Sequence, residues 1–141
     1  MKKMLSFVIV GIMLSLAAQI PAYEHGPVFR NHARIKVQYQ AKRPDSRSWT
    51  SYTTTLADAR TESMLRNQLM QRHPGYVVRI LSASDGRDIQ ASVRYQIRRN
   101  NSSWTTGTTT LRNALTESMA RNQIAAKYPG SEVRILSMVF R

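Results

Sequence analysis

Residues 49–82 read WTSYTTTLADARTESMLRNQLMQRHPGYVVRILS, and residues 104–137 read WTTGTTTLRNALTESMARNQIAAKYPGSEVRILS. The two stretches agree at 21 of 34 positions with an offset of 55 residues, and the match extends upstream to Val37 and Val93 at an offset of 56. A repeat with a period of about 50 residues indicates one small supersecondary unit used twice. A functional site is therefore expected in both copies or between them.

The pattern within each copy predicts the order β-β-α-β. Residues 33–41 alternate between apolar and polar side chains, as a half-buried strand does. A turn and a second strand, rich in threonine and aromatic residues, begin near Trp49 and complete a hairpin. A helix follows, and Pro74 and Gly75 end it before an apolar final strand at residues 77–82. The second copy repeats this order.

Two features of the helices can be predicted from spacing. Thr55 with Asp58, and Thr110 with Asn113, have the spacing of an N-cap threonine and a polar partner three residues later, which predicts that the helices begin there. Each helix also carries a glutamate four residues before an arginine, and these pairs are Glu62–Arg66 and Glu117–Arg121. Two apolar stripes compete for the buried face of the first helix: Leu56, Ala59, Ser63 and Met70, or Met64, Leu65 and Leu69.

The predicted fold class is α+β, made of tandem pseudo-symmetric ββαβ repeats with the helices packed on one face of an antiparallel or mixed sheet. The repeats span residues 33–84 and 91–141, and an inter-repeat turn spans residues 85–90. Asp85-Gly86 is a hairpin signal that could join both repeats into one continuous sheet. However, a first strand that is flanked on both sides within its own repeat would have no free edge, so both arrangements stay open.

The N-terminus has the pattern of a secretory signal peptide over residues 1–22, followed by an extended lead-in over residues 23–32. Two lysines precede an apolar run at residues 4–18, which is shorter than the ~20 residues that a spanning helix needs. This pattern favours a cleaved signal over a membrane anchor. The protein is therefore expected to be exported, and periplasmic or secreted.

Composition favours an anionic partner. Removal of residues 1–22 takes away two of the 21 basic residues and none of the 8 acidic ones, which leaves a net charge of +11 over 119 residues. Such an excess steers anionic partners to the protein, although it also keeps small proteins soluble. The chain has no cysteine, so disulfides and thiol chemistry are excluded.

Catalytic residues are not repeated in a usable arrangement. Only His73 of the three histidines lies within a repeat, and its counterpart is Tyr128. The only acids repeated in kind, Glu62 and Glu117, each precede an arginine that favours the ionised carboxylate, whereas a general acid needs the opposite environment. We therefore expect a protein that is not an enzyme and has no cofactor, although a lysine or threonine nucleophile stays possible.

Repeated arginines make the main candidate site. Arg79 and Arg134 interrupt otherwise apolar final strands, so each lies on the face opposite its apolar neighbours. If the helices cover the apolar side, six cations share one open sheet surface, which would bind anions: Arg79, Arg134, Arg34, Lys36, Arg94 and Arg98. The simpler interpretation is a solvated polar face.

Other candidates carry weaker signals. Trp49 and Trp104 could be stacking platforms or core residues. Cleavage after Ala22 would place His25 third in the chain, where it could complete a Cu(II) or Ni(II) site; otherwise no metal is expected. Identical polar stretches could contact a ligand or partner from the helices, or could be ordinary helix surface: Arg66, Asn67, Gln68, Arg121, Asn122 and Gln123.

Three classes of function follow from these observations. The first is non-enzymatic binding of an anionic surface or polymer, such as envelope lipid or glycan phosphates or nucleic acid. The alternative is a periplasmic protein–protein interaction module that acts as an inhibitor or accessory subunit on an envelope protein. The third is a hydrolase of an unrecognised kind. Salt dependence separates the first two classes, because binding to polyanions weakens steeply with salt.

Overall fold

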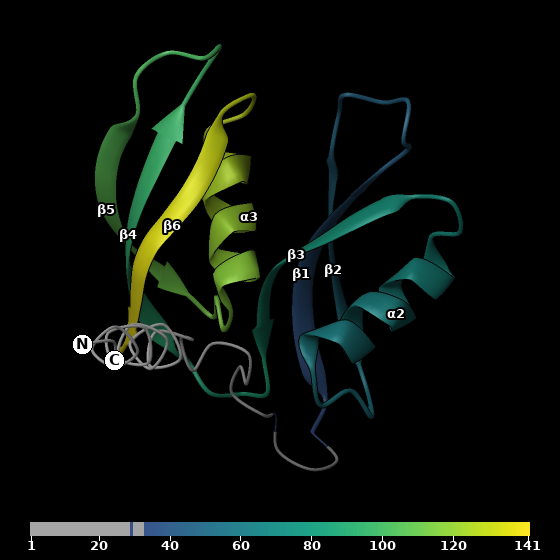
Figure 1. Cartoon of the computed structure of the whole chain (residues 1–141). Coiled ribbons are helices and arrows are strands. Elements are labelled where there is room, and N and C mark those ends of the chain that lie inside the picture. The colour runs from purple at the N-terminus through teal and green to yellow at the C-terminus, as the bar shows by residue number, and fades with distance from the viewer. Residues whose placement is uncertain (1–28, 30–32) are drawn as a thin grey trace, which may run out of the picture.

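The computed structural model describes Phe29 and residues 33–141, and the predicted signal peptide and His25 lie outside these residues. The described chain has an α+β fold of two three-stranded antiparallel sheets and two helices (Figure 1). We call residues 33–84 the first half and residues 91–141 the second half. The elements are β1 Ile35–Lys42, β2 Thr50–Leu56, α2 Glu62–Arg72, β3 Val77–Ser84, β4 Gln90–Arg98, β5 Thr105–Arg112, α3 Glu117–Lys127 and β6 Glu132–Phe140.

Each sheet has its first strand in the centre, with the orders β2-β1-β3 and β5-β4-β6. Because β1 and β4 are paired on both sides, β3 and β4 do not pair with each other in the part of the chain that the structure describes. The continuous sheet that Asp85-Gly86 could have made is therefore excluded. The turn instead closes on itself, with Arg87 Nη2 2.6 Å from Asp85 Oδ2. Both β3 and β6 carry a bulge, which leaves Leu81 and Leu136 without a paired residue on the central strand.

The helices begin six residues later than predicted. Thr61 and Thr116 are the N-caps, and their hydroxyl oxygens accept hydrogen bonds from the backbone N–H groups of Met64 and Met119 at 3.3 and 3.1 Å. The prediction of caps at Thr55 and Thr110 was wrong because these residues belong to β2 and β5. Asp58 and Asn113, the proposed capping partners, have φ values of 58° and 54°, and this left-handed turn redirects the chain before each helix.

The predicted ion pairs within the helices form. Arg66 Nη2 lies 3.1 Å from Glu62 Oε1, and Arg121 Nη2 lies 2.6 Å from Glu117 Oε1. Neither apolar stripe is buried as a whole: on α2 only Leu65 and Leu69 are buried, whereas Met64 and Met70 are 40% and 48% exposed. Burial of one such leucine side chain contributes about 1.5–3 kcal/mol, so these two positions fix the inward face of α2.

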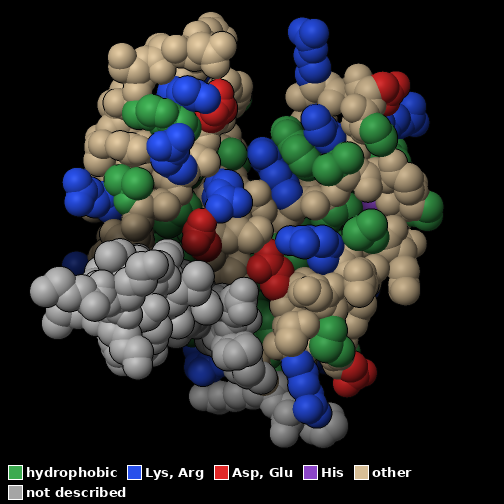
Figure 2. Space-filling model, viewed as in Figure 1, with side chains coloured by type: hydrophobic (Ala, Val, Ile, Leu, Met, Phe, Trp, Pro, Cys, Tyr) green, Lys and Arg blue, Asp and Glu red, His purple; other side chains and the backbone are tan. Residues whose placement is uncertain are grey.

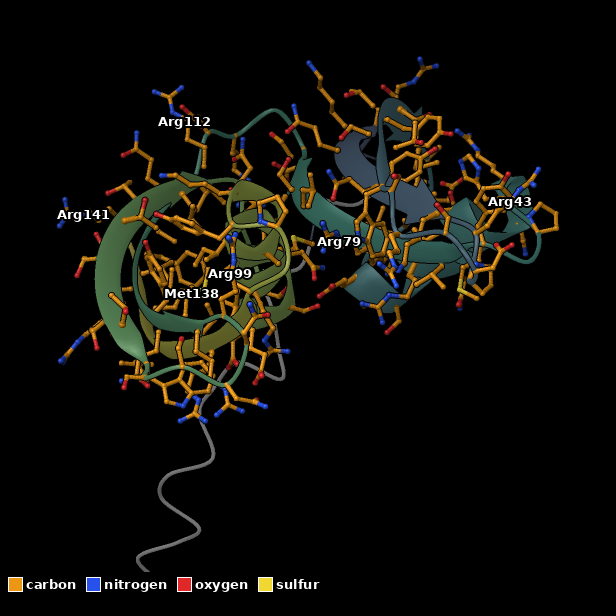
Figure 3. All side chains as sticks on the ribbon, turned by 90° about the horizontal axis from the view of Figure 1, so that it is seen from above. Arg43, Arg79, Arg99, Arg112, Met138 and Arg141 are labelled. Atoms are coloured by element: carbon orange, nitrogen blue, oxygen red, sulfur yellow. The ribbon has the colours of Figure 1, made fainter. Side chains whose placement is uncertain are left out.

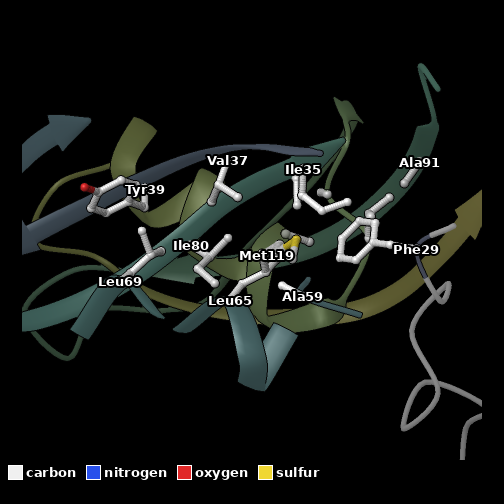
Figure 4. Packing of buried hydrophobic residues seen from close by; sticks show 14 of the residues in the cluster. Phe29, Ile35, Val37, Tyr39, Ala59, Leu65, Leu69, Ile80, Ala91 and Met119 are labelled. Carbon is white, nitrogen blue, oxygen red and sulfur yellow. The ribbon is translucent and has the colours of Figure 1, made fainter. Parts of the chain in front are cut away.

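The core forms between the alternating side chains of the central strands and the helices. Ile35, Val37 and Tyr39 of β1 are buried, as are Val93 and Tyr95 of β4. Figure 4 shows the β1 side chains over Leu65 and Leu69 of α2, with Ile80 of β3 beside them. The polar residues between them on each strand consequently face away from this core.

The two helices have unequal surroundings. In Figure 1, α3 lies between the second sheet and β3, whereas α2 lies at the far side of the first half. Met119 of α3 is 1% exposed and joins the buried cluster near Leu65 and Ile80 (Figure 4). The helix of the second half therefore packs on both halves. None of the helices in the described residues is long and apolar enough to span a membrane.

Candidate anion-binding site

An arginine stacks on a tryptophan in the first half. The guanidinium carbon of Arg79 lies 4.0 Å from the ring centroid of Trp49, and Lys42 Nζ lies 5.0 Å from it. Gln40 holds the guanidinium from the side, because its Oε1 accepts hydrogen bonds from Arg79 Nε and Nη2 at 2.8 and 2.6 Å. Gln40 and Arg79 are paired residues of β1 and β3, so the sheet register brings them together. We call these four residues the first cation–tryptophan cluster.

The second half repeats the stack at the equivalent positions. The guanidinium carbons of Arg134 and Arg98 lie 3.8 and 4.6 Å from the ring centroid of Trp104. Arg98 is also paired with a carboxylate, since its Nη2 lies 2.9 Å from Glu132 Oε2. Trp104, Arg134, Arg98 and Glu132 form the second cation–tryptophan cluster. Cation–π contacts of this kind contribute about 0.5–2 kcal/mol and hold the guanidinium over the ring.

Of the three arginines that lie over tryptophan rings, Arg79 and Arg134 are not neutralised by an ion pair within the described residues. Within the described residues, neither Arg79 nor Arg134 forms an ion pair, because the carboxylates that are paired contact other cations. Burial lowers the pKa of Arg79 from its ordinary value. An arginine nonetheless stays charged at neutral pH, so Arg79 is a half-buried cation that a bound anion would stabilise.

A cleft of about 470 Å³ adjoins the first cluster. Arg47, Trp49 and Arg79 line it from the first half, and Ala125 and Ala126 of α3 line it from the second. Figure 3 shows Arg79 on the side of the first half that faces the second, and Figure 2 shows a notch between the halves with Lys and Arg side chains nearby. The first cluster therefore lies at a concave site between the halves.

The six predicted cations are divided between the two halves of the chain. Arg34, Lys36 and Arg94 are exposed, as is Arg134, whereas Arg79 and Arg98 are partly buried. The expected single surface shared by all six does not form, because each half builds its own sheet and α3 packs against β3. Instead, the structure forms one cation–tryptophan cluster in each half.

The sequence did not indicate Gln40 and Lys42 of the first cluster, Glu132 of the second cluster, or Arg47 of the adjoining cleft. Lys42 and Gln40 lie at alternate positions of β1, so their shared face was predictable, but their contacts with Trp49 and Arg79 depend on the register between β1 and β3. Arg47 lies in the turn before β2. Trp49 and Trp104 are half-buried and outside the core cluster, so the interpretation of them as core residues was wrong.

The identical helix residues serve different purposes in the two copies. Asn122 Nδ2 donates to the backbone carbonyl of Ile80 at 2.9 Å, and Gln123 Nε2 donates to that of Leu81 at 2.6 Å. Gln123 Nε2 also donates to the carbonyl of Arg112 within its own half at 3.2 Å, as its counterpart Gln68 does to that of Ala57 at 3.0 Å, whereas Asn67 is exposed. In the second copy these residues therefore join the halves and are not available to a ligand.

The described residues contain no group of three or more metal-ligating side chains. Comparison with known proteins gives no family: no protein-family model, no characterised protein and no solved structure matches this chain.

Proposed function

We propose that the protein is a non-enzymatic binder of an anionic surface or polymer, such as envelope lipid or glycan phosphates or nucleic acid. The observation that carries this proposal is the stacked, unpaired arginine that recurs in both halves, Arg79 on Trp49 and Arg134 on Trp104. The net charge of +13, or +11 without residues 1–22, supports it by drawing anions to the whole surface.

The chemistry of the clusters suits an oxyanion. An arginine that lies flat on an indole ring directs its N–H groups outward from the ring edge, where two phosphate or carboxylate oxygens can be bound side by side. In the first cluster Gln40 accepts Nε–H and one Nη2 hydrogen of Arg79, so Nη1 and the second Nη2 hydrogen would reach the ligand. Two clusters on one body would bind a repetitive anion by avidity, because the second contact becomes intramolecular.

We further propose the organisation that such a binder needs. Residues 33–84 and 91–141 would be pseudo-symmetric ββαβ repeats, each with its helix on one face of its sheet, and residues 85–90 the turn between them. Residues 1–22 would be removed on export, which places the protein in the periplasm or outside the cell. The basic clusters would then meet anionic envelope components.

The test is a titration of the mature protein with heparin, with anionic phospholipid vesicles and with single-stranded DNA at about 50 and 200 mM salt. If several anions are neutralised, affinity should fall by about tenfold or more between these concentrations. The variant Arg79→Ala/Arg134→Ala removes both stacked cations, and we expect it to weaken binding to whichever polyanion binds.

The matched control is Arg60→Ala/Arg112→Ala, which removes the same charge from exposed positions outside both clusters. Equal loss in the two double variants would mean that net charge alone drives binding. Absence of binding at low salt would contradict the proposal and favour the protein-interaction module.

A further inference from the structure

The first and second halves contact each other along an interface that we call the seam, and its two sides are formed by different elements. One side is α3, which contributes Thr116, Met119, Asn122 and Gln123. The other side is β3 with the start of α2: Ile80 and Leu81 accept the amide hydrogens of Asn122 and Gln123, and Glu62 Oε2 accepts a hydrogen bond from Thr116 Oγ1 at 2.7 Å. We call the first side the helix face and the second side the strand face.

The sequence motifs that form the two sides of the seam each occur twice in the chain. The helix-face motifs TESM and RNQ occur at residues 116–119 and 121–123, and they recur unchanged at residues 61–64 and 66–68 of α2. The strand-face motif VRILS occurs at residues 78–82 and recurs at residues 133–137 of β6. Each half therefore carries both a helix face and a strand face, but the chain uses only one of each.

The unused faces are exposed. Met64 of α2 is 40% exposed, whereas its docked counterpart Met119 is 1% exposed. On β6, Leu136 is 44% exposed, and Val139 and Phe140 further along the strand are 60% and 40% exposed. Asn67 is exposed, and no side chain of the described residues donates to the carbonyl of Ile135 or Leu136. An exposed edge strand with apolar side chains is a site for pairing with another chain.

We propose that a second copy of this chain occupies these faces, with α2 of one molecule docked on β6 of the next as α3 docks on β3 within the molecule. Met64 would take the place of Met119 in this contact. Asn67 and Gln68 would donate to the carbonyls of Ile135 and Leu136 of the neighbouring molecule. The contact joins two different faces, so each added molecule presents another free face, and the product is a head-to-tail chain or a closed ring.

The contact between molecules is weaker than the seam within one. Leu115, which is 4% exposed just before α3, is replaced by Arg60 just before α2, and Ala125 is replaced by the larger Met70. Like charges on two molecules also repel until salt screens them. Within one chain the short connection supplies a high effective concentration that separate molecules lack. Association should therefore depend on protein concentration and increase with salt, which is the opposite of the salt dependence expected for anion binding.

The test is sedimentation velocity of the mature protein from about 1 µM to 1 mM in about 0.5 M salt, where surface charges are screened. The wild type should form species larger than dimers as concentration rises. Met64→Glu removes the free helix face and Leu136→Glu the free strand face, and either change should raise the apparent dissociation constant by about tenfold or more. A mixture of the two variants retains one intact pair of faces, so it should form a 1:1 dimer and nothing larger.

Val77→Glu is the matched control, because Val77 is 43% exposed outside the seam and the second copy has Glu132 there. It should associate like the wild type. A second measurement uses the cysteine-free chain: Gln68→Cys mixed with Leu136→Cys should give disulfide-linked dimers on oxidation, whereas neither variant alone should. A wild type that is monomeric at 1 mM, or a mixture of the two glutamate variants that does not dimerise, would overturn the proposal. Failure here leaves anion binding untouched, because the polyanion titrations use dilute protein.

Discussion

Thr116 Oγ1 donates a hydrogen bond to Glu62 Oε2 at 2.7 Å and thereby joins the N-termini of the two helices across the seam. The same hydroxyl oxygen accepts from the N–H of Met119 at 3.1 Å, so one side chain caps α3 and binds the first half. Its counterpart Thr61 caps α2 but has no contact with Glu117 among the side-chain hydrogen bonds of the described residues. Identical residues thus have unequal energetic roles.

Thr116→Ala should therefore destabilise the protein more than Thr61→Ala. Loss of an N-cap costs about 1 kcal/mol in either case. The Thr116→Ala substitution also removes the hydrogen bond that Glu62 accepts from the second half. A double-mutant cycle of Thr116→Ala with Glu62→Gln, measured by urea unfolding at low protein concentration, should give a coupling of about 0.5–3 kcal/mol. The cycle of Thr61→Ala with Glu117→Gln should give a coupling near zero, and equal couplings would contradict the asymmetry.

Asn122→Ala should lower the free energy of unfolding by about 1–3 kcal/mol, because the carbonyl of Ile80 loses its donor in a part-buried seam. Asn67→Ala, an identical change at the equivalent exposed position, should stay within about 0.5 kcal/mol of the wild type. Both variants should unfold in a single urea transition, since neither half buries a sufficient core alone. Two separate transitions would instead indicate halves that fold independently.

Gly107→Ala should destabilise the second half, although replacement of glycine within a strand usually helps. A Cβ atom at Gly107 would lie 2.6 Å from Cζ of Tyr95, whose side chain is 6% exposed and has little room to move. The first half has Tyr52 at this position, and there the ring stacks on Tyr39 with centroids 5.3 Å apart. We expect a loss of about 1–3 kcal/mol in urea unfolding. Thr108→Ala, one residue away on exposed strand surface, is the control and should have a much smaller effect.

Stability should fall at alkaline pH because of two buried tyrosines. Burial raises the pKa of Tyr39, and a hydrogen bond with Tyr128 together with burial raises the pKa of Tyr95. A tyrosine whose pKa is higher in the folded state contributes stability that is fully present below its unfolded pKa of about 10, and this contribution is lost as pH rises through the folded pKa. Urea midpoints at pH 8 and pH 11 measure the loss.

Phenylalanine substitutions at both positions should flatten this part of the pH profile. Tyr39→Phe also removes the hydrogen bond of 2.8 Å to His73 Nε2, so its stability at pH 8 should be lower by about 1 kcal/mol. Tyr52→Phe serves as the control, because Tyr52 is exposed on β2. A profile that is unchanged in Tyr39→Phe/Tyr95→Phe would show that other groups cause the alkaline loss.

The duplication made the element order predictable, because each strand and helix signal occurs in two copies. Strand alternation also placed Arg79 and Arg134 on the polar sheet faces. The helix starts could not be predicted from spacing alone, because the left-handed φ angles of Asp58 and Asn113 have no distinct sequence signal and a threonine lies at both candidate positions. Local pattern favours a cap wherever a threonine precedes a helix, whereas the true start depends on how the chain leaves β2.

Local sequence patterns could not predict which copy of a repeated residue contacts the other half. Asn67 and Asn122 have the same neighbours in sequence, yet only Asn122 reaches a strand, because only α3 lies between the two sheets. The stacking of Arg79 on Trp49 was likewise hidden, since it depends on the register of β3 and on the path of the turn before β2. The contact of Asn122 with β3 and the stacking of Arg79 on Trp49 both depend on the tertiary arrangement of the elements.

The unequal surroundings of the two tryptophans give the chain a built-in optical probe for each half. The protein has two tryptophans, and Trp49 faces the cleft that α3 helps to line, whereas Trp104 is stacked by Arg98 and Arg134 of the second half. Replacement of either indole by phenylalanine leaves the emission of the other. Fluorescence of Trp49 would then follow the opening of the seam, and fluorescence of Trp104 would follow the second sheet, without any added label.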